Sequence, residues 1–463
     1  MAWLPARFRG DRSQWRDRPG FAPEFLGSRQ PAILSQPSGT LDGVLPPTAT
    51  AQPFTNHDVT GLIVTVAGIG ADGWPGLSPR SKAVIESADV IVGGPRQLSL
   101  LPGTISGERV PLPSPLHPGL SELVERHSSA TLVVLASGDP MFYGIGATLV
   151  RLLGAPRVRV LPHPSSVSLA AARLGWPLDD TDIVSLVGRP LELLHPLLQP
   201  GRRVLALVAA PTAAAEVREL LDARGFGGSP LTLLADLGGP DEIVAPADGA
   251  PHSRLAILAI ECRPDLSAAP LPRVPGLPDD AYEHDGQITK REIRALALAA
   301  LAPVPGQLLW DVGAGSGSVG IEWMRVHPAS RAIAIEPRAE RAERIVRNAA
   351  SLGVPGLRVV AGAAPEALAG LPRPDAIFAG GGVTADGVLD ACWAALPAGG
   401  RLVANAVTIE GQSVLQKWHR RAGGTLTRMN VERAGALGSF TAWRPALPVV
   451  QWAIRREHEQ EEL

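Results

Sequence analysis

Short β-branched apolar runs alternate with Ala- and Leu-rich stretches along the chain from Gly61 onward. The first run, in GLIVTVAGIG, ends in a glycine-rich turn, and SPRSKAVIESA after it has helical spacing. Further runs occur in DVIVGG, ATLVVLASG, RVRVLP, RRVLALVAAP and LAILAIEC. Strands of this length that alternate with helices are typical of α/β domains. The pattern therefore predicts an α/β domain over residues 59–262.

A Pro-rich, polar stretch at residues 263–282 interrupts this pattern. Its composition is typical of a linker between domains. TKREIRALALAALAP then has the spacing of a helix, and Thr289 and Glu292 form the T-x-x-E pattern of a capping box at its start. This helix is expected to open a second domain, residues 283–463.

Five apolar runs in the second domain predict strands separated by helical stretches. They are QLLWDVG, RAIAIE, LRVVAG, DAIFAGG and GRLVANAV. This order is typical of a doubly wound parallel sheet. The last two apolar segments, in GTLTRMNVERA and PVVQWAIRRE, predict a terminal pair of strands.

The first 58 residues differ from the rest of the chain. They are rich in Pro, Ser, Thr and Gln and show no sustained period. Such a segment buries too little apolar surface to fold by itself, so we expect a disordered extension without chemistry over residues 1–58, or translation from an upstream start codon. A folded arm or an organelle-targeting segment is a further alternative, which Asp11, Asp17 and Glu24 disfavour.

Composition and charge restrict the class of protein. Hydrophobic residues make up 45% of the chain, and the formal net charge is −2, which excludes a generic basic surface for nucleic acid. No apolar run approaches the ~18 residues of a membrane-spanning helix. The two cysteines, Cys262 and Cys392, lie far apart and match no metal-ligand spacing. We therefore expect no metal site and a reducing, cytoplasmic compartment.

The most informative stretch is LLWDVGAGSGSVGIEW, which predicts a buried strand, a glycine-rich turn and the start of a helix. Gly315, Gly317 and Gly320 match the dinucleotide fingerprint G-x-G-x-x-G. Glu336 follows 19 residues after Gly317, near the position of a ribose-binding acid. In an open parallel sheet, ligands bind beyond the carboxyl ends of the strands. The stretch therefore predicts a site for either NAD or S-adenosylmethionine.

Asp311 distinguishes between these two ligands. Its carboxylate, two residues before Gly313 in a loop without Lys or Arg, would repel a pyrophosphate but suits an ammonium and a sulfonium. Glu336 does not discriminate, because both ligands contain a ribose. The loop therefore favours a methyltransferase over an NAD-dependent oxidoreductase. A tight turn without any ligand is a third alternative, which the clustered glycines disfavour.

The acid–loop–acid pattern DVGAGSG…IAIE resembles the class I, Rossmann-like methyltransferases. Together with DGQITKREIRA, GAAPEAL, DAIFAGGG and LVANAVTIEG, it resembles the C-terminal half of the precorrin-6Y methyltransferase (decarboxylating) family. In the first half, TVAGIGADGWPGLSP, VIVGGPRQL, LASGDPMFYGIGATL and PHPSSVSLAAARLGWPLDD resemble the class III tetrapyrrole methylases. The resemblance extends from about Leu62 to the end. It implies a class III methylase of two α/β subdomains followed by a class I methyltransferase.

The resemblance also implies an activity in vitamin B12 synthesis that uses S-adenosylmethionine, one molecule per domain. The N-terminal type of domain is associated with methylation of carbon 5 of a precorrin-6 type macrocycle. The C-terminal type is associated with methylation of carbon 15 and loss of the carboxyl of the ring C acetate. A cobalt-precorrin substrate of the anaerobic route and a non-catalytic, cofactor-binding scaffold are alternatives. A homo-oligomer is expected, with no nucleic-acid or membrane partner.

By the same resemblance, two sets of residues lie along the cofactor clefts. Ala363 stands where many class I enzymes place an Asp for the adenine amine, so backbone groups near Ala363 and Ala364 are expected to hold the adenine. In the first half, GIGADG departs from the G-x-G-P-G of many relatives. The N-terminal set is Gly68, Gly70, Gly73, Ser137, Gly138, Asp139, Pro140, Ser165 and Ser166. The C-terminal set is Gln287, Thr289, Asp311, Gly313, Ala314, Gly315, Ser316, Gly317, Glu336, Ala363 and Ala364.

The implied substrate carries many carboxylates, so cations are expected to face it. Lys290 and Arg291 stand in the first turn of the predicted helix, where the helix dipole disfavours positive charge and an anionic ligand would relieve the conflict. The alternative is a solvated pair neutralised by Glu292. His284 and Tyr282 precede this helix and are candidates to exchange protons with the substrate, although a lone surface His usually has no such role.

Glycines and one amide complete the expected substrate site. AGGG, at the end of the fourth strand of the second domain, offers clearance for a bulky planar molecule. The residues assigned to the substrate besides the two cations are Gly380, Gly381, Gly382 and Asn405.

Overall fold

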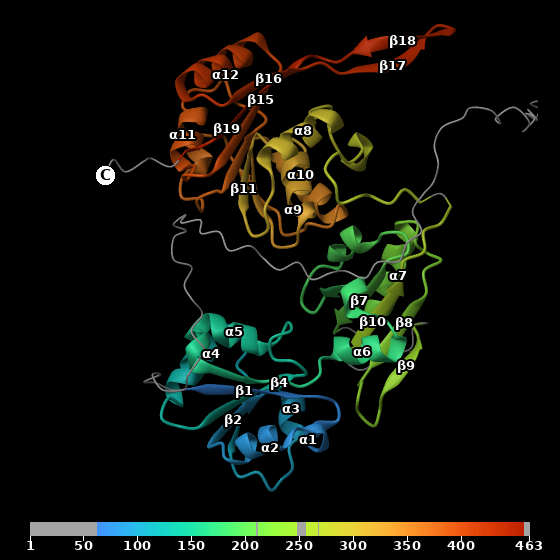
Figure 1. Cartoon of the computed structure of the whole chain (residues 1–463), viewed down its shortest axis with the longest axis vertical. Helices are drawn as coiled ribbons and strands as arrows, with labels where there is room; N and C mark the ends of the chain where they lie inside the picture. Colours follow the sequence, from blue (N-terminus) through green and yellow to red (C-terminus); the bar gives the residue numbers. More distant parts are fainter. Residues whose placement is uncertain (1–62, 210–211, 248–255, 267, 458–463) are drawn as a thin grey trace, which may run out of the picture. The chain divides into compact units, whose positions relative to one another are not determined.

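The computed structural model describes residues 63–209, 212–247, 256–266 and 268–457. The expected extension, residues 1–58, lies outside these ranges. The described chain contains two five-stranded sheets, one seven-stranded sheet and a two-stranded hairpin (Figure 1). None of the described helices is both long and apolar enough to cross a membrane.

The first sheet consists of five parallel strands in the order β3-β2-β4-β1-β5. Its central strands are continuous apolar runs because helices cover both faces. Helices α4 and α5 pack on one face, and α2 and α3 pack on the other. The strands are β1 (Val64–Ile69), β2 (Val90–Gly93), β3 (Glu108–Pro111), β4 (Leu132–Ser137) and β5 (Val158–Leu161). The helices are α1 (Gly73–Gly76), α2 (Pro79–Glu86), α3 (Pro95–Ser99), α4 (Leu116–Arg126) and α5 (Ile145–Leu153).

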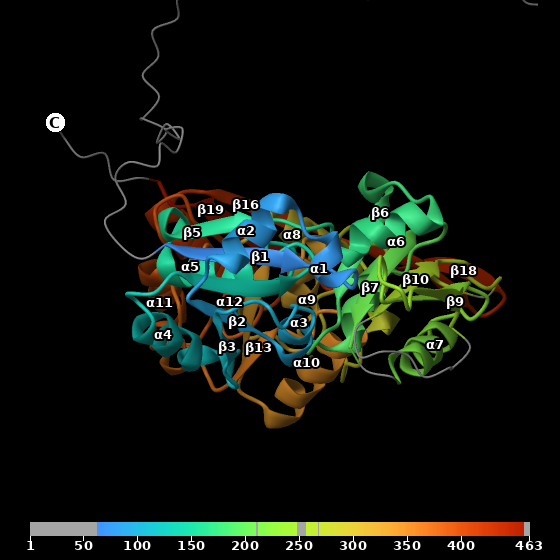
Figure 2. The ribbon, with the colours of Figure 1, turned by 90° about the horizontal axis from the view of Figure 1, so that it is seen from below.

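The second sheet is mixed, in the order β6-β7-β10-β8-β9. Because side chains alternate between the faces of a strand, β7 and β10 present apolar residues to a helix on each side. Figure 2 shows these helices, α6 and α7, on opposite sides of β7 and β10. The strands are β6 (Thr181–Ser185), β7 (Arg203–Val208), β8 (Leu231–Ala235), β9 (Ile243–Pro246) and β10 (Ala256–Glu261). The helices are α6 (Ser166–Leu174) and α7 (Ala213–Ala223). The expected two α/β subdomains of the N-terminal half are confirmed.

The third sheet has the order β13-β12-β11-β14-β15-β19-β16. Its first five strands are parallel, as predicted, and α8, α9 and α10 cover one face while α11 and α12 cover the other. The strands are β11 (Leu308–Val312), β12 (Arg331–Glu336), β13 (Arg358–Ala361), β14 (Ala376–Ala379), β15 (Arg401–Ala406), β16 (Thr425–Met429) and β19 (Val449–Arg455). The helices are α8 (Arg291–Leu301), α9 (Ser318–Val326), α10 (Ala339–Ser351), α11 (Val388–Ala395) and α12 (Ile409–Ala422).

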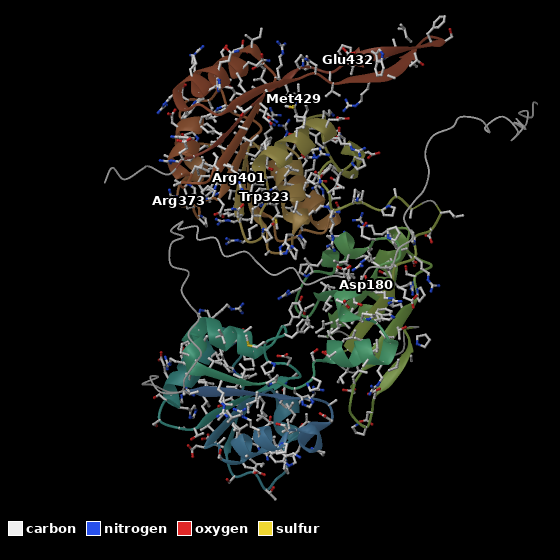
Figure 3. All side chains as sticks on the ribbon, viewed as in Figure 1. Asp180, Trp323, Arg373, Arg401, Met429 and Glu432 are labelled. Carbon is white, nitrogen blue, oxygen red and sulfur yellow. The ribbon has the colours of Figure 1, made fainter. Side chains whose placement is uncertain are left out.

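The predicted terminal pair of strands is confirmed, since β16 and β19 are antiparallel neighbours and β19 also pairs with β15. A hairpin between them was not predicted. Its strands, β17 (Glu432–Leu437) and β18 (Phe440–Pro445), extend away from the sheet (Figure 1). Met429 closes β16 inside the sheet, and Glu432 opens the hairpin a few residues later (Figure 3).

The predicted capping box at the start of α8 is wrong. The N-cap is Lys290 rather than Thr289, and no side chain caps the helix. Glu292 is unavailable for the box because its carboxylate binds the guanidinium of Arg433, on β17. The first turn of α8 is therefore linked to the hairpin.

The end of the Pro-rich stretch is packed into the C-terminal domain around a buried carboxylate, that of Glu322 on α9. The backbone N–H groups of Gly276 and Leu277 donate to its two oxygens at 2.6 and 2.9 Å. The fully buried Arg294 of α8 donates through Nε at 2.6 Å, and the hydroxyl of Tyr282 donates at 2.9 Å. Residues 276–282 are therefore a structural part of this domain, although their composition predicted a linker.

Candidate functional site

A cavity of about 620 Å³, here called the C-terminal cavity, opens at the carboxyl ends of β11, β12, β14 and β15. This is the edge of a parallel sheet at which ligands are expected. The wall also includes the segment before α8 and the residues that flank the hairpin. Predicted residues in the wall are Gln287, Thr289, Lys290, Gly313, Ala314, Gly315, Glu336, Ala363, Ala364, Gly380, Gly381, Gly382 and Asn405.

The loop after β11 needs glycine at Gly313 for a geometric reason. Gly313 has a φ of +67°, and a Cβ there would lie 2.8 Å from the backbone of Gly381. The N–H groups of Gly313 and Ala314 both donate to the carbonyl of Ile335, which ties the loop to the end of β12. A substituted residue would separate these segments, so the glycine loop and the AGGG turn form one compact wall.

Glu336 ends β12 and presents a largely buried carboxylate to the cavity. One oxygen accepts from the N–H of Gly315 at 2.9 Å, and the other accepts from the N–H of Arg338 at 3.2 Å. These bonds fix the carboxylate, and each oxygen still has a lone pair for another donor. The arrangement suits two adjacent hydroxyls of a ribose.

Asp311 is positioned differently from the prediction, since it does not border the cavity. It is buried under the loop, where one carboxylate oxygen accepts from the N–H of Gly320 at 2.9 Å. The other oxygen has no hydrogen-bond partner among the described residues. Burial raises the pKa of Asp311 to about 7, with a further contribution from the charge of Glu336, while the Gly320 bond lowers it. In this arrangement Asp311 supports the loop rather than contacting a ligand.

The raised pKa of Asp311 predicts a pH-dependent stability. The ionised form is disfavoured in the folded state, so stability is fully present below pH 3.8 and is lost as the pH rises toward about 7. A shift of this size corresponds to on the order of 4 kcal/mol. We expect Asp311→Asn to reduce this dependence in urea unfolding at pH 5 and pH 8. Equal pH dependence in wild type and variant would show that another group is responsible.

Several other predicted residues lie outside the cavity wall in this structure. Ser316 and Gly317 are buried where α9 begins, and the carbonyl of Ser316 accepts from the side chain of Asn348. Tyr282 is buried with its hydroxyl bound to Glu322, so it is not positioned to exchange protons with a ligand in this cavity.

The exposed residues around the start of α8 also differ from the prediction. His284 accepts a bond from the N–H of Gly286 through Nδ1, outside the wall. Of the predicted cation pair, Lys290, the N-cap of α8, borders the cavity, and Arg291, the first helical residue, does not. Lys290 lies 3.7 Å from the carboxylate of Asp279.

The wall contains three arginines that were not predicted: Arg338, Arg341 and Arg433. Arg341 is held by Asp285 at 2.8 Å, and Arg433 is bound by Glu292. Arg338 is exposed. Arg338 follows Glu336 closely, so its position could have been inferred from the ribose acid. Arg433 is brought to the cavity by the unpredicted hairpin.

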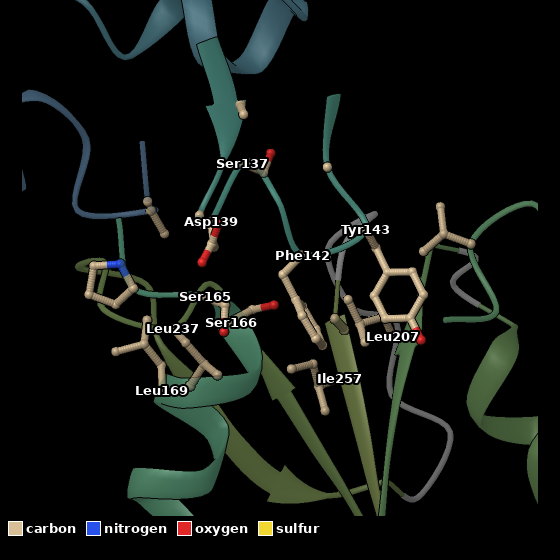
Figure 4. A pocket seen from close by; sticks show the side chains of 18 of the residues that line it. Ser137, Asp139, Phe142, Tyr143, Ser165, Ser166, Leu169, Leu207, Leu237 and Ile257 are labelled. Atoms are coloured by element: carbon tan, nitrogen blue, oxygen red, sulfur yellow. The ribbon is translucent and has the colours of Figure 1, made fainter. Parts of the chain in front are cut away.

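A second cavity of about 330 Å³, the N-terminal cavity, is lined by loops after β1, β4 and β5 and by residues of the second sheet. Figure 4 shows Ser137, Asp139, Ser165 and Ser166 around it, with the rings of Phe142 and Tyr143. Of the predicted residues, those in its wall are Gly70, Ser137, Gly138, Asp139, Ser165 and Ser166.

Gly68, Gly73 and Pro140 support these loops without bordering the cavity, and all three are buried. A Cβ on Gly68 would lie 2.1 Å from the carbonyl oxygen of Gly138, so only glycine lets the β1 and β4 loops approach. One carboxylate oxygen of Asp139 accepts from the N–H of Met141. Ser165 is the N-cap of α6 and accepts from the N–H of Ser168.

The described residues contain no group of three or more His, Cys, Asp or Glu side chains that could hold a metal ion. The two cavities instead offer glycine-lined loops, and the C-terminal cavity adds an acid at the end of the second strand of its parallel sheet. Tight loops that only glycine permits, together with Glu336, fit a nucleoside cofactor such as S-adenosylmethionine.

Both halves of the chain match known families. Residues 64–250 match the Tetrapyrrole (Corrin/Porphyrin) Methylases, and residues 280–456 match the Precorrin methyltransferase domain. The fold and the two cavities therefore belong to a methyltransferase with two domains of different class. This finding removes the NAD-dependent oxidoreductase alternative for the Gly315 loop.

Similar proteins cover nearly the whole folded chain. A precorrin-6Y C(5,15)-methyltransferase (decarboxylating) from Sinorhizobium sp is 52% identical over 395 residues, 84% of this chain and 95% of that protein. One from Mycobacterium tuberculosis is 44% identical, over 85% of this chain and 100% of that protein. A C-terminal domain structure from Rhodobacter capsulatus is 49% identical, covers 40% of this chain and 100% of that chain, and has a TM-score of 0.39. The chain belongs to the precorrin-6Y C(5,15)-methyltransferase (decarboxylating) family.

Proposed function

We propose that this enzyme methylates carbons 5 and 15 of a precorrin-6 type macrocycle and removes the carboxyl of its ring C acetate in cobalamin biosynthesis. The observation that carries the proposal is a pair of separate glycine-lined cavities, one in each segment that matches a methyltransferase family. The names of the relatives at 52% and 44% identity support both the substrate and the positions methylated.

The C-terminal cavity has a suitable group for each part of S-adenosylmethionine, which supplies a methyl group activated on sulfonium when bound. Glu336 would accept from the ribose hydroxyls, and the glycine loop would let the backbone approach the methionine portion. Ala363 and Ala364 leave room for the adenine without offering it a side-chain acceptor. The remaining task of the protein is alignment of the acceptor carbon with the methyl group.

Cations at the edge of the same cavity would bind the carboxylates that the substrate keeps. Lys290 and Arg433 have half-exposed side chains, and Arg338 is also exposed. Their present partners are carboxylates on the protein: Asp279 for Lys290 and Glu292 for Arg433. Exposed pairs of this kind contribute little to stability, so substrate carboxylates can replace one partner at low cost.

The N-terminal cavity would hold a second molecule of cofactor. Its loops are formed by Gly70, Gly138 and Asp139, and the hydroxyls of Ser137, Ser165 and Ser166 add polar groups to a largely apolar wall. Asp139 uses one carboxylate oxygen in its own turn, which leaves the other for a ligand. This arrangement supports one cofactor per domain.

The proposal is tested by the products that the full-length chain forms from metal-free and cobalt-loaded precorrin-6 type substrates. Mass spectrometry should show two added methyl groups and one lost carboxyl. Conversion of only one of the two substrates assigns the chain to the metal-free or the cobalt route. A wild-type enzyme that modifies neither substrate, although it binds S-adenosylmethionine, contradicts the proposed function.

We expect Gly68→Ala to abolish methylation by the N-terminal domain alone, because the added Cβ would lie 2.1 Å from a backbone oxygen. The product should then gain one methyl group and still lose one carboxyl. Gly103→Ala is the matched control, since no heavy atom lies within 4 Å of its added Cβ. If Gly68→Ala retains both methylations at the wild-type rate, the N-terminal cavity is not the second methylation site.

A further inference from the structure

A buried amide in the C-terminal cavity has hydrogen-bond donors without an acceptor. Asn405 lies near the end of β15, is 8% exposed and borders the cavity. Its Nδ2 is buried and has no hydrogen-bond partner among the residues that the structure describes. A buried donor left unpaired destabilises the fold, so its presence in a cavity wall indicates a ligand acceptor.

The orientation of this amide is set by a second buried amide, that of Gln451. Asn405 and Gln451 are direct partners in the antiparallel pair of β15 and β19. The Nε2 of Gln451, which is 6% exposed, donates to the Oδ1 of Asn405 at 3.1 Å. Because Gln451 occupies the oxygen side of Asn405, the nitrogen side is the one left without a partner among the described residues. Gln451 itself does not border the cavity.

Asn405 lies on the side of the cavity that we assign to the substrate, away from the proposed cofactor contact of Glu336. Glu336 ends β12, on one side of the glycine loop of β11, whereas Asn405 lies on β15, beyond β14 and the AGGG turn. The strand order therefore puts Asn405 on the other side of the loop from the ribose acid. An amide nitrogen can only donate, so the substrate group that it meets must be an acceptor.

The cavity offers a carboxylate two kinds of donor: charged donors at its edge and a neutral donor in its wall. The cations Lys290 and Arg433 have side chains that are 45% and 48% exposed, at the edge. Asn405 is neutral and buried. A cation bound to a carboxylate stabilises its negative charge and so opposes loss of carbon dioxide, whereas a neutral hydrogen bond orients the group and stabilises it less.

We propose that Asn405, oriented by Gln451, binds the carboxylate of the acetate that is lost, while the cations at the edge bind carboxylates that are retained. The inference rests on the proposed function. In the reaction, the bond between the methylene and the carboxylate carbon breaks, and its electron pair passes into the conjugated macrocycle. Carbon dioxide leaves, and a proton from water is added to the methylene carbon to give a methyl group. Asn405 is the residue that touches the substrate, and Gln451 is a positioning residue.

The test measures decarboxylation and methylation separately in the full-length enzyme with a precorrin-6 type substrate. Asn405→Ala should lower the rate of carbon dioxide release at least tenfold and let a product that retains its carboxyl accumulate. Its affinity for S-adenosylmethionine and its methylation by the N-terminal domain should stay within twofold of wild type. Gln416→Ala, on an exposed position of α12, is the control with wild-type behaviour.

Two variants of Gln451 separate orientation from folding. Gln451→Met has a similar volume and leaves Asn405 free to rotate, so decarboxylation should slow by less than in Asn405→Ala. Gln451→Glu offers only acceptors when it is ionised, so it would bind the Nδ2 of Asn405 and turn Oδ1 toward the cavity. Decarboxylation should therefore slow more in Gln451→Glu than in Gln451→Met.

Failure of this inference can be distinguished from failure of the proposed function by the activity of the wild-type enzyme. If wild type forms no decarboxylated product, the proposed function fails first. If wild type is active and Asn405→Ala releases carbon dioxide at the wild-type rate, the inference is overturned. Should Asn405→Ala lose its thermal unfolding transition, the comparison of the two Gln451 variants decides. Equal rates in both of them also overturn the inference.

Discussion

Replacing Glu322 by Ala should lower the free energy of unfolding of the C-terminal domain by about 3–5 kcal/mol, the range for breaking a buried ion pair from one side. The carboxylate accepts hydrogen bonds from four groups: the side chains of Arg294 and Tyr282 and two backbone N–H groups of the packed Pro-rich segment. Its loss leaves the fully buried Arg294 with Asp279 as its remaining ion-pair partner among the described residues, and it leaves the other three donors without this acceptor.

Urea unfolding followed by tryptophan fluorescence measures this change, because Trp323 lies on the same helix as Glu322. The matched control is Glu343→Ala, an exposed position of α10, which should change stability by no more than about 0.5 kcal/mol. If the two variants unfold at the same urea concentration, the Glu322 cluster does not stabilise the domain.

Glu336→Ala should weaken S-adenosylmethionine binding at the C-terminal cavity by more than a hundredfold. Two hydrogen bonds to a charged group are each worth about 1.5–3 kcal/mol, and about 1.4 kcal/mol corresponds to a tenfold change in affinity. The loss should exceed the loss in Glu336→Gln, which keeps one acceptor oxygen for the ribose and for the loop. The N–H of Gly315 loses its acceptor in Glu336→Ala, whereas the side-chain oxygen of Glu336→Gln can still accept from it.

Calorimetry on the full-length chain resolves this effect if the two cavities bind independently. Affinity at the N-terminal cavity serves as the internal control and should not change. A decrease of less than threefold at the C-terminal cavity would mean that Glu336 does not hold the ribose.

The parallel core of the C-terminal domain could be predicted because its buried strands are apolar runs separated by helical stretches, whereas the mixed pairing of the second sheet was not predicted. Glu336 could be predicted as well, since it ends the strand next to the glycine loop and a fixed spacing connects the two. Asp311 follows the same motif, but the sequence cannot show which way a side chain at a strand end points. Its carboxylate is directed to the N–H of Gly320, beneath the loop.

The remaining parts of the site depend on contacts between distant segments. Gln451 meets Asn405 only because β19 inserts next to β15, and a sequence pattern shows that β19 is a strand without showing its neighbour. Glu292 matched a capping box locally, yet its carboxylate binds Arg433, 141 residues away. Tyr282 preceded a helix and was assigned to proton exchange, whereas the buried carboxylate of Glu322 determines its position. In each case a tertiary partner outweighed the local pattern.

The packed segment at residues 276–282 also determines where the chain can be split into two separately encoded proteins. A break within residues 263–275 would leave the N–H groups of Gly276 and Leu277 on the same product as Glu322. A break at residue 282 would separate those donors from their acceptor and leave them at the end of the other product. A C-terminal domain that is encoded separately is thus expected to begin several residues before α8. Those residues are needed for folding, even though their composition is that of a linker.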